Sequence, residues 1–296
     1  MSSQNRNQLI VYGLLILAVV IWGFNFSFVK WVVSQIHPLA FNVFRFSIAA
    51  TLIVTVLSVK EGWKRIPPLD LLKLAGLGFL GHSIYQIFFI SGISLTTAGN
   101  SSLLLATSPI WTALISAALG KDEVTRKAWM GIILAFVGVF LVTLGSGNRL
   151  TFYGTKTSGD LLIVAAALAL SLYTVLSRDL LDRYSPLKLT AVTMFFGMIG
   201  LWVFGWRRVV AENWFSLSLT SWAVLLYSSI FAIVLGYVIW FTAVRSVGPT
   251  RASVFNNMTP IVAFSVAFIV LGEPVSWLQA IGGFTVISGV ILTTRN

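Results

Sequence analysis

The chain has 296 residues, of which 57% are hydrophobic and 10% are charged, and it contains no cysteine. An average soluble protein carries about 25% charged residues, so this chain lacks the polar surface that a soluble enzyme or a nucleic-acid-binding domain needs. The missing cysteines exclude disulfides, thiolate metal sites and cysteine nucleophiles. The formal net charge of +11 does not indicate a nucleic-acid-binding protein in a chain of this composition, and the positions of the basic residues relative to the membrane must explain it.

Hydrophobic stretches long enough to cross a bilayer recur along the whole chain. A helix rises about 1.5 Å per residue, so a hydrocarbon core of about 30 Å needs about 20 apolar residues. The first stretch is too long for a signal peptide and no cleavage site follows it, so we expect it to be retained. The sequence predicts an all-α membrane protein with ten spans, in chain order Leu9–Val29, Leu39–Val59, Leu69–Ile90, Ala98–Leu119, Ala128–Gly145, Gly159–Leu176, Leu187–Trp206, Ser221–Val244, Pro249–Leu271 and Val275–Thr294.

The lysines and arginines between these spans favour one side of the membrane. With the N-terminus in the cytoplasm, the inner segments hold 14 of them and the outer segments hold five. Lysine and arginine concentrate in cytoplasmic loops, so the split predicts that both termini are cytoplasmic. The inner residues are Arg6, Lys60, Lys64, Arg65, Lys73, Lys121, Arg126, Lys127, Arg178, Arg183, Lys188, Arg245, Arg251 and Arg295, and the outer ones are Lys30, Arg149, Lys156, Arg207 and Arg208.

The two halves of the chain resemble each other. Adding 151 to Pro109 gives Pro260, and SPIWTALISAALG (108–120) reads like TPIVAFSVAFIVLG (259–272). The same offset pairs Gly131 with Gly282 and Gly138 with Gly289, while the early part of each half has an offset of about 148. Each half holds five spans, so the second half must enter the membrane from the opposite side. We therefore predict an inverted-topology repeat of residues 1–147 and 148–296, with a transport site near the midplane where the halves meet.

Several segments carry a family resemblance. IWGFNFSFVK (21–30), HPLAFNVFRF (37–46), TTAGNSSLLLATSPIWTAL (96–114), LGKDEVT (119–125) and LGEPVS (271–276) resemble the EamA domains of the drug/metabolite transporter superfamily. GDLLIVAAALALSLYTVLSRDLL (159–181) resembles the opening of a second such domain. The resemblance covers essentially the whole chain and implies a ten-helix exporter of small metabolites or amino acids in a bacterial inner membrane. The aromatic-lined spans are similar to those of aromatic and broad-specificity amino-acid exporters.

Four predicted spans carry a polar and aromatic stripe, because residues at i, i+3, i+4 and i+7 share one helix face. A Tyr hydroxyl or Trp indole in lipid needs a hydrogen-bond partner, so we expect the stripes to line a wet cavity between the halves. Helix–helix packing is the alternative explanation. The stripes are Trp22, Asn25, Phe26 and Val29 in the first span, His82, Tyr85, Gln86 and Phe89 in the third, Leu170, Tyr173, Thr174 and Ser177 in the sixth, and Ile233, Gly236, Tyr237 and Trp240 in the eighth.

Pro109 and Pro260 lie at matching places in the fourth and ninth spans. Proline cannot donate to the carbonyl four residues back, so we predict that the carbonyls of Leu105 and Asn256 are released at membrane depth. Pro-broken helices at corresponding places in two halves indicate a transporter site. Two interpretations stay open: a kink packed by small residues, or direct contact with substrate through Asn256 and Asn257.

Charged groups inside the predicted spans are scarce. Arg45 lies about two turns into the second span, where an arginine costs at least about 2.5–3.5 kcal/mol on insertion scales. We expect Arg45 to support the fold through bonds to helix-end carbonyls. All nine carboxylates fall in loops or at span ends, and only His82 could titrate within a span near neutral pH. A single His is more often a hydrogen-bonding side chain than a proton relay, so we predict gradient-driven or weakly coupled transport.

The sequence therefore predicts an alternating-access exporter of amino acids, aromatic or neutral, or of similar small metabolites. No phosphate-binding glycine loop, HExxH or GxSxG motif occurs, so we expect no enzyme activity, no cofactor and no metal. Alternatives are an exporter of drugs, nucleosides or lipid-linked sugars, and a membrane-embedded enzyme or structural protein. The expected partners are a small-molecule substrate and the lipid bilayer, not nucleic acid, and one chain with both halves makes a monomer sufficient.

Overall fold

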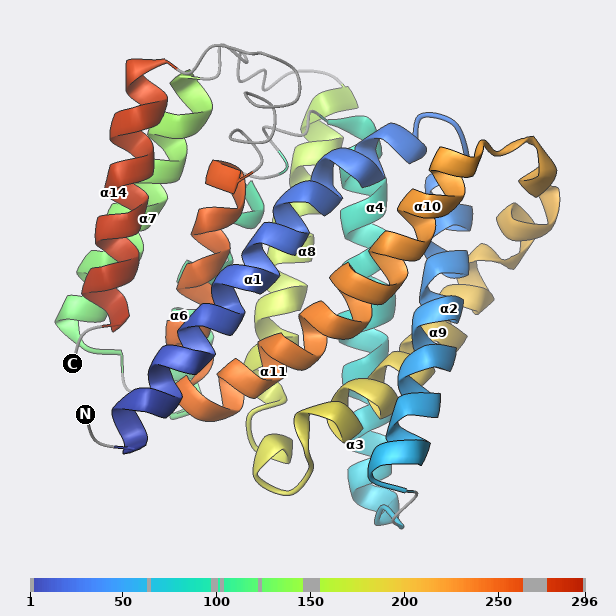
Figure 1. The fold of residues 1–296 in the computed structure, drawn as a ribbon, viewed down its shortest axis with the longest axis horizontal. Coiled ribbons are helices and arrows are strands. Elements are labelled where there is room, and N and C mark those ends of the chain that lie inside the picture. The colour runs from blue at the N-terminus through green and yellow to red at the C-terminus, as the bar shows by residue number, and fades with distance from the viewer. Residues whose placement is uncertain are drawn as a thin grey trace.

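The structure, a computed structural model, describes residues 3–62, 65–96, 101, 104–121, 124–145, 155–262 and 276–294. Within these ranges every regular element is a helix, and the helices run side by side in one bundle (Figure 1). The predicted boundary at residues 147 and 148 and the second part of the ninth predicted span lie outside the described residues. Several helices begin at a proline, whose fixed φ suits the first turn of a helix and whose missing N–H is not needed there.

In the described residues the helices follow eight of the ten predicted spans, and the fourth and ninth spans are described only in part. In the first half they are α1 (Ser3–Val32), α2 (Pro38–Lys60), α3 (Pro68–Gly78), η1 (Phe79–Ile84), α4 (Tyr85–Leu95), α6 (Ser108–Ala118) and α7 (Arg126–Gly145). In the second half they are α8 (Thr155–Leu176), η2 (Leu180–Asp182), α9 (Pro186–Ala211), η3 (Trp214–Ser216), α10 (Leu219–Tyr227), η4 (Ser228–Leu235), α11 (Gly236–Val247), α12 (Pro249–Val254), η5 (Phe255–Met258) and α14 (Trp277–Thr294).

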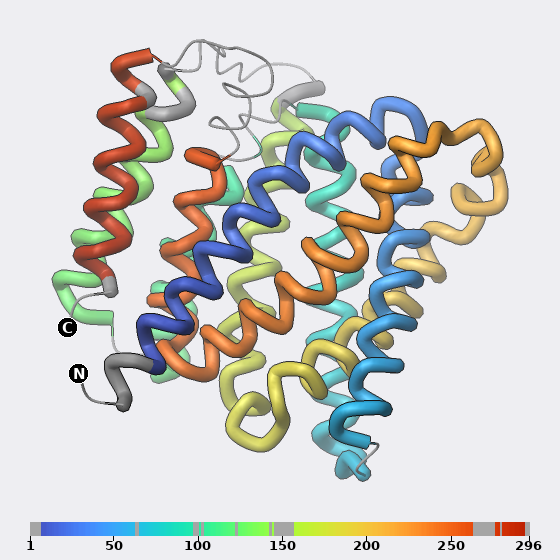
Figure 2. The backbone as a smooth tube through the Cα atoms, viewed as in Figure 1, coloured from blue at the N-terminus to red at the C-terminus, as the bar shows by residue number. Residues whose placement is uncertain are grey.

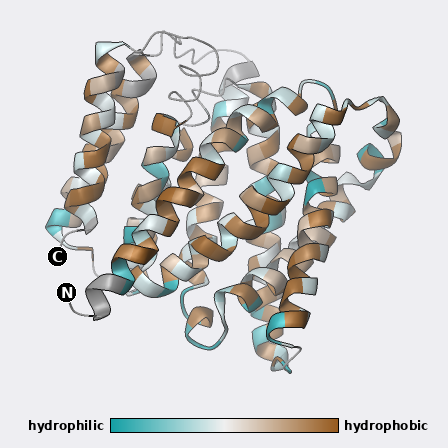
Figure 3. Cartoon of the chain, in the orientation of Figure 1, coloured by the Kyte–Doolittle hydropathy of each residue, from teal (hydrophilic) through white to brown (hydrophobic). Residues whose placement is uncertain are grey.

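Many of these helices are long and apolar enough to cross a membrane. Hydrophobic residues line them over most of their length (Figure 3). Large side chains such as Val203 and Phe284 are exposed. The chain is therefore a multi-pass membrane protein, as its composition predicts. Six helices in the described residues meet the length and hydropathy that a span needs: Asn7–Val32, Pro38–Lys60, Pro68–Leu95, Thr157–Leu176, Pro186–Ala211 and Leu219–Val247.

Two of the long helices contain a π-helical stretch at equivalent places. η1 joins α3 to α4, and η4 joins α10 to α11. Adding 151 to the bounds of η1 gives residues 230–235, which fall within η4. π-helical turns are rare and occur often at functional sites. Their recurrence at the same position in both halves indicates that the local geometry belongs to the repeat.

The helices α7 and α14 pair along one edge of the bundle (Figure 2). Gly131 lies against Gly289, and a Cβ atom at Gly131 would approach the Gly289 carbonyl oxygen to 2.6 Å. Gly138 lies in the same way against Gly282, with 2.7 Å to its carbonyl oxygen. Since Gly282 and Gly289 are the repeat equivalents of Gly131 and Gly138, the contacts are reciprocal. Reciprocal contacts of this kind are what a two-fold axis between the helices produces.

The connections between helices lie at two opposite edges of the bundle (Figure 1). The start of α1 lies at the same edge as the turn between α2 and α3 and the turn between α8 and α9. At this edge Asp70 accepts hydrogen bonds from Arg183 at 3.2 Å and from the Tyr184 hydroxyl at 2.7 Å. At the opposite edge the His37 amide donates to Glu212 at 2.9 Å. Polar contacts therefore join the two halves at both edges.

Candidate functional site

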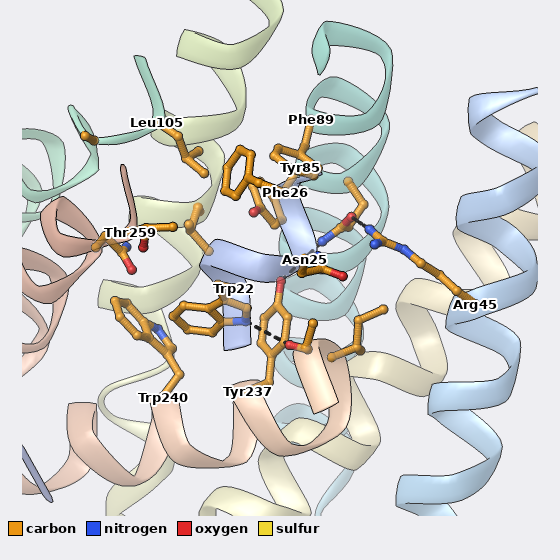
Figure 4. Close-up of a pocket in the computed structure, with 16 residues that line it drawn as sticks. Trp22, Asn25, Phe26, Arg45, Tyr85, Phe89, Leu105, Tyr237, Trp240 and Thr259 are labelled. Atoms are coloured by element: carbon orange, nitrogen blue, oxygen red, sulfur yellow. Dashed lines mark hydrogen bonds between the residues drawn. The ribbon is translucent and has the colours of Figure 1, made fainter. Parts of the chain in front are cut away.

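A pocket opens between helices of both halves (Figure 4). Its empty volume is about 790 Å³, counting the part open to solvent. Its wall is mainly aromatic and aliphatic, with a few polar groups. It is lined by Trp22, Asn25, Phe26, Arg45, Tyr85, Gln86, Phe89, Leu105, Ala106, Leu170, Ala232, Ile233, Tyr237, Trp240, Asn256 and Thr259.

Many of the lining residues are repeat equivalents of one another. The offset of 151 relates Gln86 to Tyr237, and Gln86 Nε2 donates to the Tyr237 hydroxyl at 3.4 Å. The pocket therefore lies where equivalent helices of the two halves meet. The same offset relates Phe89 to Trp240 and Leu105 to Asn256, and the offset of 148 relates Trp22 to Leu170.

Two tryptophans form part of the aromatic wall. The rings of Trp22 and Trp240 lie 5.7 Å apart at an interplanar angle of 61°. Trp22 Nε1 donates to the Ala232 carbonyl in η4 at 2.9 Å, and Trp240 Nε1 donates to Thr174 at 3.2 Å. Since both indoles are satisfied inside the bundle, neither needs the headgroup region where many membrane-protein tryptophans lie. Both rings line the pocket.

Arg45 lies at the pocket wall and is 2% exposed. Its Nε donates to Asn42 at 2.9 Å, and its terminal nitrogens donate to Ser228 and to Gln86 at 2.8 Å each. The prediction that Arg45 bonds helix-end carbonyls is therefore wrong, because all three acceptors are side-chain oxygens. Arg45 projects inward from the middle part of α2, towards η4 and α4, and so does not reach the helix ends. Its guanidinium also lies 5.3 Å from the ring centre of Phe41.

Comparison with known proteins identifies the family. The EamA-like transporter family matches residues 9–144 and, a second time, residues 157–295. The chain belongs to the EamA-like transporter family. The resemblance predicted from the sequence motifs is thus confirmed, and the protein is a membrane transporter.

Relatives and a solved structure agree with this assignment. An uncharacterised transporter of Archaeoglobus fulgidus is 32% identical over 95% of this chain and 96% of its own. The uncharacterised transporter YyaM of Bacillus subtilis is 29% identical over 95% and 92%. A probable terminal-alkyne amino-acid exporter of Streptantibioticus cattleyicolor is 26% identical over 95% and 92%. A protein crystal structure superposes with a TM-score of 0.78 over 96% of both chains at 17% identity, which shows a shared fold.

Six residues of the predicted stripes lie outside the pocket of this EamA-like transporter: Val29, His82, Tyr173, Thr174, Ser177 and Gly236. His82 is fully buried, and its Nε2 lies 2.9 Å from the Tyr173 hydroxyl and 3.3 Å from Thr193 Oγ1. Tyr173 is also fully buried and lies 2.9 Å from Thr193 Oγ1. The stripe of the third span was predicted with 3.6 residues per turn, whereas residues 79–84 are π-helical. The wider turn separates His82, which faces α8 and α9, from Tyr85 and Gln86, which face the pocket.

The ninth predicted span contains a 3₁₀ turn before Pro260. Asn256 lines the pocket, and its Nδ2 donates to Ser108 at 3.4 Å. The Asn256 carbonyl accepts from the Thr259 amide, so the prediction that this carbonyl is released is wrong. Asn257 is fully buried and does not line the pocket, because successive residues of a tight 3₁₀ turn point in different directions.

The equivalent proline of the fourth predicted span begins a new helix. Pro109 lies in the first turn of α6, after a turn at residues 106–107. The Ser108 carbonyl accepts from Ser171 Oγ of α8 at 2.9 Å. Leu105 and Ala106, which line the pocket just before α6, were not predicted as site residues. Their position next to a proline-broken turn is the signal that could have identified them.

The sequence analysis did not predict the hydrogen-bond partners of Arg45, because the sequence marks them only weakly. The partners of Arg45 include Asn42, one turn before it on α2, and Ser228, half of a serine pair within an otherwise apolar segment. A polar residue one turn from a buried arginine is a usable signal, but a single serine is not. Within the residues that the structure describes, no group of three or more His, Cys, Asp or Glu side chains could hold a metal ion.

Proposed function

We propose that this transporter exports amino acids, aromatic or neutral ones, or similar small metabolites across the bacterial inner membrane by alternating access. In this proposal ten transmembrane helices form a five-plus-five inverted repeat with both termini in the cytoplasm. The observation that carries the proposal is the pocket between the halves, where Gln86 meets its own repeat equivalent, Tyr237. Substrate sites of inverted-repeat transporters lie at such an interface.

Alternating access follows from this symmetry. If the two halves have the same fold and opposite orientation, exchanging their conformations turns an inward-open pocket into an outward-open one without moving the site. The interruptions in the helices supply places where backbone can bend. They are the π-helical stretches η1 and η4 and the turns before Pro109 and Pro260, all of which border or adjoin the pocket. Because one chain supplies both halves of the pocket, a monomer is sufficient.

The wall of the pocket supports an amino-acid substrate. The faces of Trp22, Trp240 and Tyr85 suit an apolar or aromatic side chain, and each good ring contact contributes about 0.5–1.5 kcal/mol. Polar atoms of Asn25 and Gln86 lie close by for the charged end of the molecule. The relative named as a probable terminal-alkyne amino-acid exporter supports the same substrate class.

The chemistry of the pocket favours weakly coupled or gradient-driven transport. No Asp or Glu is among its lining residues, and two described carboxylates that are buried, Asp70 and Asp160, lie near the beginnings of α3 and α8. Proton-driven transporters commonly place an acidic residue on the ion path. We therefore expect the substrate gradient itself to drive net movement.

Counterflow in proteoliposomes tests this proposal. Vesicles loaded with an unlabelled amino acid are diluted into the same amino acid in labelled form, for a panel of neutral and aromatic amino acids, with and without a pH gradient. We expect transient accumulation of label for at least one aromatic or neutral member, with little effect of the pH gradient. Failure of the whole panel, with accumulation of a labelled nucleoside or cationic drug instead, would contradict the amino-acid assignment.

A further inference from the structure

Arg45 carries a positive charge that has no negative partner in the described part of the chain. The three oxygens that accept its hydrogen bonds belong to Asn42, Ser228 and Gln86, which are uncharged. The salt bridges found among the described residues involve other arginines and lysines. Burying a charge is costly unless it is paired, and charged side chains at membrane depth usually pair with an opposite charge or with backbone carbonyls. Among the described residues no anion balances this charge, so the guanidinium is available to a negatively charged group of a bound molecule.

The guanidinium also has hydrogen-bonding capacity to spare. It has five N–H donors, and the bonds found use one from Nε and one from each terminal nitrogen. Two donors, one on each terminal nitrogen, have no acceptor among the described residues. A carboxylate has two oxygens and can accept from both terminal nitrogens of a guanidinium at once. Figure 4 shows Arg45 reaching from its helix into the pocket, on the side where Asn25 lies.

Asn25 supplies a complementary acceptor at the same pocket. Its side-chain Oδ1 is buried and has no hydrogen-bond partner in the residues that the structure describes. An ammonium group has donors only, so an amide oxygen of this kind suits it. A guanidinium and a free amide oxygen at one side of an aromatic pocket thus match the two ends of a zwitterion, with its side chain towards Trp22 and Trp240.

We propose that Arg45, supported by Gln86, binds the carboxylate of the transported molecule. This inference rests on the proposed function and narrows it, because it makes a carboxylate a requirement for binding. Arg45 would then do more than tie α2 to η4 and α4. Since the charge of the arginine is balanced only when a carboxylate is present, amines and amides of the same shape are rejected.

Matched acid and amide probes test the requirement. Equilibrium binding to the purified full-length protein in detergent is measured by calorimetry for L-phenylalanine and L-phenylalaninamide, L-leucine and L-leucinamide, and 3-phenylpropionate and 3-phenylpropanamide. The last pair lacks the ammonium group and so tests the carboxylate alone. We expect each acid to bind at least about 10-fold more tightly than its amide, as the loss of a charge-assisted hydrogen bond implies.

Two variants locate the effect at Arg45. Arg45→Lys keeps the charge but removes the guanidinium, and should reduce the preference for acids about 10-fold. Gln86→Glu places a carboxylate where the amide oxygen now accepts from Arg45 at 2.8 Å, so it should neutralise the arginine and abolish the preference while the protein stays folded. Arg178→Lys, at an exposed pair with Asp182, is the matched control and should leave the preference unchanged.

The outcomes separate this inference from the proposed function. Equal binding of acids and amides, or an acid preference unchanged in both Arg45→Lys and Gln86→Glu, would overturn the carboxylate site even if counterflow of amino acids succeeds. Failure of every acid to bind would overturn it as well. Failure of amino-acid counterflow together with tight binding of 3-phenylpropionate would keep the carboxylate site and overturn the proposed substrate class.

Discussion

Gln86 and Tyr237 lie 151 positions apart in the sequence and touch in the pocket, where the amide of Gln86 donates to the phenol oxygen of Tyr237 at 3.4 Å. A residue can contact its own repeat equivalent only where the axis that relates the two halves passes close to both. The reciprocal glycine contacts between α7 and α14 mark a second place on such an axis. The pocket and the helix pair at the edge are therefore parts of one symmetric arrangement.

The glycine contact gives a prediction about stability. Gly131→Ala would place a methyl group 2.6 Å from the Gly289 carbonyl oxygen, so α7 and α14 must move apart. We expect a loss of about 1–3 kcal/mol, typical of overpacking, seen as a lower melting temperature in detergent. Gly283→Ala on α14 is the matched control, because a Cβ atom there meets nothing within 4 Å. Equal melting temperatures for the two variants would show that the close helix pairing is absent.

A variant of Tyr173 tests whether the buried hydrogen-bonded group of His82, Tyr173 and Thr193 is separate from the pocket. Its hydroxyl lies 2.9 Å from both His82 Nε2 and Thr193 Oγ1 in a site closed to solvent. Tyr173→Phe removes these bonds and should destabilise the protein by about 1–3 kcal/mol. Since Tyr173 does not line the pocket, affinity for a transported amino acid should be unchanged, whereas Tyr85→Ala should lower it. Thermal unfolding and calorimetry measure the two quantities, and a large loss of affinity in Tyr173→Phe would place Tyr173 in the site.

The sequence predicts the long helices well, because hydropathy over about 20 residues depends little on side-chain detail. It predicts part of the pocket as well, since Trp22, Asn25, Tyr85, Tyr237 and Trp240 share faces that an ordinary α-helix explains. These faces lie outside the π-helical and 3₁₀ stretches.

Two of the errors fall where the helix is irregular, whereas Tyr173 lies in the regular helix α8. His82 lies in η1 and Asn257 in η5, and in both places the number of residues per turn departs from 3.6. Arg45 was misjudged for another reason. Its acceptors Ser228 and Gln86 are far apart in sequence, and only the packing of η4 and α4 against α2 brings them to it.

The stability should depend on pH through His37, which lies outside the spanning segments. Its Nδ1 accepts from the Leu39 amide at 3.2 Å and caps α2. Partial burial lowers the pKa of His37 below its usual value, and repulsion from Arg208 is the second, smaller cause. Attraction to Glu212 acts in the opposite direction and is the smallest of the three effects. A lowered histidine pKa in the folded state means that stability is full above the unfolded value of about 6.5 and is lost as the pH falls below it.

The predicted loss of stability through His37 is measured as the difference between the melting temperatures at about pH 7.5 and about pH 5.5, which lie above and below the usual pKa of a histidine. We expect a larger drop on acidification for the natural protein than for His37→Asn, which keeps a capping oxygen but cannot titrate. An equal drop in both proteins would mean that other groups cause the acid sensitivity.

The orientation can be tested by cysteine labelling, because the natural chain has no cysteine. Lys60 is the last residue of α2, at the edge of the bundle where α1 begins, and Ser216 lies in η3 at the opposite edge. Both positions are exposed, so Lys60→Cys and Ser216→Cys can be labelled. A membrane-impermeant maleimide applied to intact spheroplasts should label Ser216→Cys and should label Lys60→Cys only after permeabilisation. The reverse pattern would place the termini outside the cell.

We propose that the pocket on the axis between the halves is the transport site. Counterflow by reconstituted Trp240→Ala tests it most directly, with Trp277→Ala as control because that tryptophan is 87% exposed on α14. Removing a large aromatic contact to the substrate should cost at least about 1.4 kcal/mol, so we expect an initial rate at least about 10-fold lower in Trp240→Ala. We expect Trp277→Ala to transport at the rate of the natural protein. If Trp240→Ala also transports at that rate, the pocket is not the transport site.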